Sequence, residues 1–107
     1  MGHEAIRKKI QNLLRETAGP TCKMVYWRPP EGYSLDYPCV VMELSAINNV
    51  FADSIVYGQN LSYQVTVMDQ DKDSVIAENI SKLTMTTFDT TFISDNINHF
   101  VFTIHNN

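Results

Sequence analysis

Apolar and polar residues alternate almost without a break through residues 55–67. Because the side chains of a β-strand point alternately to opposite faces, this pattern predicts one strand with a buried face and a wetter face. At roughly 3.3 Å per residue these thirteen residues span about 43 Å, more than twice the usual strand length of about 17–20 Å. We expect residues 61–67 to lie in the core and residues 55–58 to project from the body as half of a hairpin.

The rest of the hydrophobic pattern predicts two helices and four further strands. Apolar residues at helical spacing predict helices at residues 3–17 and from residue 75 to about residue 86. Strand patterns cover residues 21–27, 39–44, 90–94 and 99–105. The predicted order is α-β-β-β-α-β-β, an α+β domain with two helices packed on a mostly antiparallel sheet that carries an extended β-hairpin arm.

The predicted hairpin joins residues 39–44 to the long strand, and turn-forming residues place its tip between residues 48 and 54. Val50 and Phe51 then lie at an exposed tip, while Ile55 and Tyr57 lie on the projecting strand. Exposed apolar side chains of this kind are typical of contact surfaces. We therefore predict that these four residues anchor a contact with a neighbouring subunit.

Length and composition are those of an ordinary globular chain. The 107 residues suit one domain, residues 1–107, with 44% apolar and 19% charged residues. No apolar run reaches the length of a membrane span, and no signal-peptide core follows Met1, so we expect a cytosolic protein without membrane contact. In such a compartment Cys22 and Cys39 are expected to be free thiols.

Charge is distributed unevenly along the chain. Through Arg28, six basic residues oppose two acidic ones, whereas beyond it two basic residues oppose ten acidic ones. This asymmetry favours head-to-tail self-association, with Arg7 and Lys8 of the first helix facing acidic loops of a neighbour. A solvated helix face with acidic loops elsewhere explains the same pattern. The net charge is −4, whereas a sequence-specific nucleic-acid binder usually carries a positively charged surface, so we expect no such binding.

Three aspartates at alternate positions, Asp69, Asp71 and Asp73, imitate the start of a calcium-binding EF-hand loop. The match fails because Ser74 replaces the turn glycine and Ile80 stands where the bidentate glutamate is needed. We instead expect these residues to cap the second helix. No other segment matches a metal, phosphate-loop or nucleophile motif, so we expect no cofactor and no enzymatic activity.

Two histidines support a rival interpretation. His99 and His105 share a strand face but lie about 20 Å apart along it, too far to bind one metal ion together. The alternative function is a small enzyme or ligand-binding domain, in which His99, His105 and either Asp89 or Asp95 surround a cleft at the end of the sheet.

Several segments around the predicted elements carry a family resemblance. A helix precedes the first strand, residues 37–41 lead into the second strand, and residues 61–69 and 71–74 connect the long strand to the second helix. Phe88-Asp89 and residues 95–100 precede the last strand. In order and spacing these segments resemble the small tail-completion proteins of long-tailed bacteriophages and prophages.

The resemblance implies a non-enzymatic structural protein that forms a ring, usually a hexamer, and terminates the tail tube or joins the tail to the head. A tail terminator and another neck or connector component fit it equally, and no catalytic residues come with it. The implied partners are further copies of the chain, the tail-tube protein and head-connector proteins. The implied location is the cytoplasm of the bacterial host during assembly, and then the tail or neck of the virion.

Overall fold

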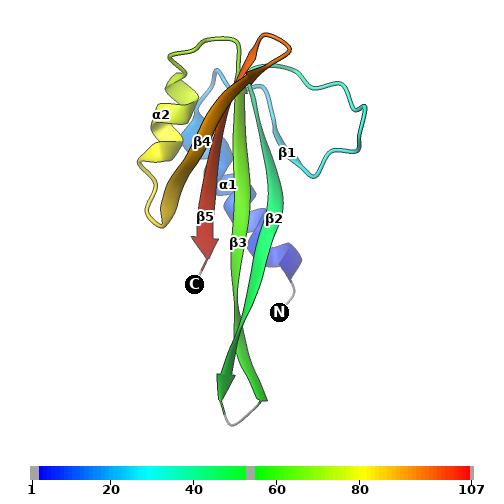
Figure 1. Ribbon diagram of the computed structural model, residues 1–107, viewed down its shortest axis with the longest axis vertical. Helices are drawn as coiled ribbons and strands as arrows, with labels where there is room; N and C mark the ends of the chain where they lie inside the picture. Colours follow the sequence, from blue (N-terminus) through cyan, green and yellow to red (C-terminus); the bar gives the residue numbers. More distant parts are fainter. Residues whose placement is uncertain (1–2, 53–54, 107) are drawn as a thin grey trace.

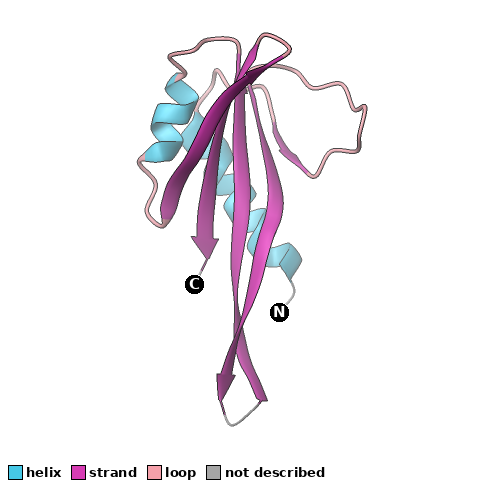
Figure 2. Cartoon of the chain, viewed as in Figure 1, coloured by secondary structure: helices cyan, strands magenta, loops and turns pink. Residues whose placement is uncertain are grey.

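Five strands form one sheet, and two helices that contact each other lie against one of its faces (Figure 1, Figure 2). The computed structural model describes residues 3–52 and 55–106. Along the chain the elements are α1 (His3–Ala18), β1 (Val25–Trp27), β2 (Cys39–Ala52), β3 (Ile55–Asp69), α2 (Val75–Ser81), β4 (Thr86–Ser94) and β5 (Ile97–Asn106). This order, α-β-β-β-α-β-β, confirms the predicted α+β fold.

The strands lie in the order β1-β2-β3-β5-β4 across the sheet. β1 is parallel to β2, and every other neighbouring pair is antiparallel. β3 has β2 on one side and β5 on the other, which makes it the central strand. β4 forms one outer edge of the sheet, and the short β1 forms the other.

The core lies between the helices and the sheet. On β3 the alternating side chains Leu61, Tyr63, Val65 and Val67 are each 1% exposed or less. They pack in one cluster with apolar residues of α1, α2 and the neighbouring strands. Burial of each large apolar side chain stabilises the fold by about 1.5–3 kcal/mol. The prediction that residues 61–67 form the core is confirmed.

β2 and β3 continue well beyond the rest of the sheet. β1 pairs with β2 only at residues 40–42, and β5 pairs with β3 only from Leu61 onward. Residues 48–52 and 55–60 therefore pair only with each other, as a two-stranded ribbon that we call the arm. Figure 1 shows the arm projecting from one end of the body, and the molecule measures 50 Å along its longest axis against 28 and 23 Å along the others. The predicted projection of residues 55–58 is confirmed.

Strand pairing in the hairpin extends further toward its tip than predicted, as far as Ala52 and Ile55. Asn48 and Asn49 lie within β2, opposite Asn60 and Gln59, although asparagine favours turns. The strand pairing outweighs that preference, and Gln59 Nε2 donates to Asn49 Oδ1 at 3.0 Å. The predicted turn residues at positions 53 and 54 lie outside the described residues.

Several other element boundaries differ from the prediction. β1 begins at Val25 rather than at residue 21, because residues 20–21 form a turn and residues 22–24 continue from it without regular strand pairing. β5 begins at Ile97 rather than at residue 99, because Ile97 and Asn98, predicted as part of a turn, pair with β4. α2 ends at Ser81 rather than near residue 86, since the amide of Lys82 closes the helix with backbone hydrogen bonds. β4 begins at Thr86 rather than at residue 90, because its first half also pairs with β5.

The acidic turn between β3 and α2 is built as a helix cap. Ser74 is the N-cap residue, and its Oγ accepts a hydrogen bond from the amide of Ala77 at 3.2 Å. The same hydroxyl donates to Asp69 Oδ2 at 2.7 Å, while Asp69 Oδ1 accepts from the amide of Asp71 at 2.9 Å. Asp69 and Ser74 are both buried, so water cannot reach their side chains, and the hydrogen bond between them satisfies the polar atoms of both. The predicted capping role is confirmed for Ser74, whereas Asp69 and Asp71 accept hydrogen bonds from amides of the turn itself.

We predict that Ser74→Ala lowers the free energy of unfolding by about 1–3 kcal/mol. The substitution removes the helix cap and leaves a buried carboxylate oxygen of Asp69 without its donor. Urea denaturation followed by circular dichroism measures the change. Ser81→Ala is the matched control, because the exposed Ser81 hydroxyl donates only to the carbonyl of Glu78 within the same helix. Equal effects of the two substitutions would contradict the capping account.

Candidate interaction surface

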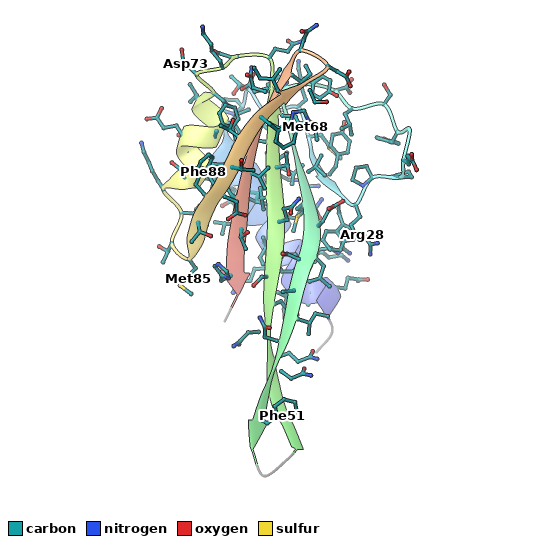
Figure 3. The ribbon with its side chains drawn as sticks, viewed as in Figure 1. Arg28, Phe51, Met68, Asp73, Met85 and Phe88 are labelled. Atoms are coloured by element: carbon teal, nitrogen blue, oxygen red, sulfur yellow. The ribbon has the colours of Figure 1, made fainter. Side chains whose placement is uncertain are left out.

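The arm carries exposed apolar side chains and almost no charge. Phe51 is 63% exposed, and Ile47, where the strands leave the body, is 44% exposed. Figure 3 shows Phe51 on the arm, away from the body. Between residues 44 and 60 the sequence contains one charged residue, Asp53. Free strand edges usually carry charges or prolines that prevent further pairing, and residues 44–60 contain no proline and only this one charge.

The four predicted anchor residues lie on the strands of the arm. Phe51 is exposed on the arm, as predicted. Val50, Ile55 and Tyr57 lie on the strands of the arm by their backbone, but their side chains lie outside the described part of the structure.

Arg7 and Lys8 of α1 have different surroundings. Lys8 Nζ lies 3.2 Å from Glu4 Oε1 within the same exposed helix face, and a hydrogen bond from Lys8 is the main reason that the pKa of Glu4 is lowered. Arg7 instead turns toward the sheet, where its guanidinium carbon lies 5.1 Å from the ring centroid of Trp27. Cation–π contact of this kind holds an arginine at an aromatic surface while leaving its donors available.

A cavity of about 240 Å³ lies at the root of the arm, lined by Glu4, Arg7, Trp27, Leu44 and Tyr63. Leu44 and Tyr63 face each other across β2 and β3, just before the strands leave the body. The alternating pattern of residues 61–67 predicts Tyr63 in the core, and the sequence pattern predicts nothing for Trp27 beyond its place in a strand. The signal that pointed here was the presence of a tyrosine rather than a phenylalanine at a core position, because a buried hydroxyl needs a hydrogen-bond partner.

Two further surfaces are apolar. The outer strand β4 is exposed along residues 87–94, and it presents Phe88, Phe92 and Ile93 to solvent. A groove of about 360 Å³ lies between α1 and the residues before β4, where Leu13 and Met85 are each nearly half exposed. Both surfaces lie on the body of the molecule, whereas Phe51 lies on the arm (Figure 3).

The residues of the rival catalytic interpretation are not brought together. His99 lies opposite Met68 and stacks on Phe92 at 4.6 Å between ring centroids, whereas His105 lies opposite Ser62 and shares a 3.1 Å hydrogen bond with its hydroxyl. The two histidines are six residues apart on β5, which corresponds to about 20 Å. Asp89 accepts a hydrogen bond from the hydroxyl of Thr103 on the same sheet.

Neither cysteine is activated as a nucleophile. Cys22 and Cys39 are free, as predicted. Burial raises the pKa of the Cys39 thiol to about 12, and burial also raises the pKa of the Cys22 thiol. A raised pKa keeps each thiol protonated near neutral pH, and a protonated thiol is a poor nucleophile.

Within residues 3–52 and 55–106, no group of three or more His, Cys, Asp or Glu side chains is placed to hold a metal ion. No helix in this part of the chain is long and apolar enough to cross a membrane.

Comparison of the chain with protein-family models, with curated proteins and with solved structures finds no match. A proposal for its function therefore depends on the sequence and on the surfaces described above.

The thiols provide a test of these surroundings. In the native protein at pH 8, we predict that Cys39 reacts with a soluble disulfide reagent at least about a hundredfold more slowly than in the unfolded chain, because its pKa is about 12 instead of the ordinary 9.0. Absorbance of the released thiolate, with and without guanidinium chloride, measures both rates. Cys22→Ser leaves Cys39 as the single thiol and serves as the control. Equal rates in the two states would contradict the buried environment.

The raised pKa of Cys39 also determines whether this thiol raises or lowers the free energy of unfolding as the pH increases. Up to about pH 9 the thiol is protonated in both states, and its burial costs nothing through ionisation. As the pH rises from 9 toward 12, the unfolded chain loses the proton first. The free energy of unfolding attributable to this group therefore falls over that range.

Proposed function

We propose that the protein is a non-enzymatic structural subunit of a long-tailed phage or prophage, which assembles into a ring that terminates the tail tube or joins the tail to the head. The observation that carries this proposal is the arm, a two-stranded ribbon that leaves the body and keeps Phe51 in solvent.

The arm has a physical need for a partner. A two-stranded hairpin is marginally stable in water by itself, and this one has no helix or third strand over residues 48–52 and 55–60. Burial of Phe51 against another protein surface would contribute about 1.5–3 kcal/mol. A neighbouring subunit can supply that surface and complete the packing that the chain itself does not provide.

Head-to-tail contact suits the asymmetry of the molecule. The arm extends from one end of the body, and β4 and α2 lie on the side opposite to β1 (Figure 1). A contact between two different surfaces of identical subunits forms a closed ring when its rotation closes. The basic first part of the chain and the acidic remainder add electrostatic attraction to such a contact.

The assignment to a phage tail rests on the resemblance described in the sequence analysis. The partners proposed are further copies of the chain, the tail-tube protein and head-connector proteins. The geometry favours this function over catalysis by His99 and His105, because those side chains have separate surroundings on β5.

We predict that Phe51→Asp leaves the subunit folded but prevents ring formation and tail completion. The substitution places a charge where an apolar contact is proposed, and the native side chain is already 63% exposed, so the core is unaffected. Native mass spectrometry measures the ring, and electron microscopy of tails assembled with each variant measures tail completion.

Ile93→Asp is the matched control for this prediction. Ile93 is a 72% exposed apolar residue on β4, away from the arm, and the same charge is introduced there. Rings and tails that are unchanged by Phe51→Asp would overturn the role proposed for the arm. Loss of assembly with both substitutions would show that the effect is not specific to the arm.

A further inference from the structure

The hydroxyl of Tyr63 has no hydrogen-bond partner among the described residues. Its side chain is 1% exposed, and its Oη is the one buried side-chain polar atom in the described part of the chain that makes no hydrogen bond. A phenylalanine at this position would fill the core without that defect. A buried donor that makes no hydrogen bond destabilises the folded state by about 1–3 kcal/mol, which is a large fraction of the stability of a small domain.

The orphaned hydroxyl belongs to the cavity at the root of the arm. The cavity has a volume of about 240 Å³, below the roughly 300–1,000 Å³ of pockets that hold drug-sized ligands, and it suits a single side chain. Trp27 meets Tyr63 edge to face at 6.0 Å between ring centroids, and Arg7 lies over Trp27. The lining of the cavity therefore includes two aromatic rings and a guanidinium.

The chemistry of this cavity favours a carboxylate. Burial raises the pKa of Tyr63, so the hydroxyl is protonated near neutral pH and has a proton to donate to a hydrogen-bond acceptor. Arg7 lines the same cavity as Tyr63, and its positive charge acts on the pKa of Tyr63 in the direction opposite to burial. An incoming carboxylate can accept from both groups at once. Glu4 also lines the cavity, but its carboxylate is already hydrogen-bonded to Lys8.

A second copy of the chain carries a suitable carboxylate on the turn between β3 and α2. Asp73 is exposed, and within the described residues its carboxylate makes no ion pair or hydrogen bond, whereas Asp69 and Asp71 accept bonds inside the turn. Figure 3 shows Asp73 at the end of the body opposite to the arm. The residues around the cavity belong mainly to the basic first part of the chain, and Asp73 belongs to the acidic remainder.

We infer that the cavity at the root of the arm is a receptor for the acidic turn of the next subunit, in which the Asp73 carboxylate accepts hydrogen bonds from Tyr63 Oη and the Arg7 guanidinium. The inference rests on the ring proposed above and names a contact within it. The long side chain of Arg7 moves off the Trp27 ring as it engages the carboxylate. The orphaned hydroxyl is then the binding determinant that remains unsatisfied in the isolated subunit.

Trp27 reports occupancy of the cavity directly, because it is the single tryptophan of the chain and lines the site. The probe is a capped peptide of residues 68–76, titrated into the full chain while tryptophan fluorescence is recorded. We expect saturable binding, at least about tenfold weaker binding when aspartates 71 and 73 of the peptide are asparagine, and about tenfold weaker binding by Tyr63→Phe. Free acetate at the same carboxylate concentration is expected to leave the fluorescence unchanged.

Tyr63→Phe separates a binding role from a structural one. Removing the orphaned hydroxyl should leave the denaturation midpoint of the isolated subunit unchanged or raise it, while ring formation weakens about tenfold. A purely structural role predicts loss of stability instead. Arg7→Glu is expected to abolish the contact, and Arg7→Glu combined with Asp73→Lys is expected to restore ring formation, because the two charges exchange places across it.

Two outcomes would overturn the inference. The first is that the Tyr63→Phe variant and the Arg7→Glu variant each form rings with wild-type affinity, while Phe51→Asp abolishes rings. The proposed function would then survive, but without this contact. The other is an equal fluorescence response to acetate and to the peptide, which identifies a site for small free carboxylates. Peptide binding and charge-exchange rescue in a protein indifferent to Phe51→Asp would support the inference and reject the proposed role of the arm.

Discussion

The length of β3 relative to the body that covers it is the constraint on which the rest of this structure depends. β3 has fifteen residues, but β5 pairs with it only from Leu61 onward and the helices cover the same part. Over that part its alternating side chains form the centre of the core. Beyond it the strand has only β2 as a neighbour, so the chain builds an arm whose packing it cannot complete. The proposed contact with another protein rests on this exposed arm.

The cavity at the root of the arm marks the point where the core ends and the contact surface begins. Tyr63 is buried, yet its hydroxyl has no hydrogen-bond partner within residues 3–52 and 55–106, and Leu44 opposite to it is already partly exposed. Arg7 reaches this point from α1, although it is twenty residues away in sequence from Trp27, on which it lies. These few side chains close the core of the subunit, and in the proposed assembly they would also donate hydrogen bonds to a second subunit.

The order of elements could be predicted from the sequence because the apolar positions that define each pattern are also the positions that are buried in the structure. Residues 61–67 alternate strictly, and the helices show apolar residues at helical spacing, so pattern and structure agree. Local preference failed where pairing opposed it: Asn48 and Asn49 favour turns, but they lie opposite residues of β3 in a continuous ladder. The cavity at the root of the arm could not be predicted from local patterns, because tyrosine and phenylalanine contribute equally to alternation and the approach of Arg7 to Trp27 is set by tertiary packing.

Hydrogen exchange of the arm amides tests the central claim most directly. In the isolated subunit, the outward-facing amides of residues 48–52 and 55–60 have no third strand and should exchange rapidly, whereas those of residues 61–67 should be protected. In the assembled ring, or on tails completed by the protein, the account predicts strong protection of the arm with little change in the core. Arm amides that exchange at the same rate in the isolated and the assembled protein would contradict it.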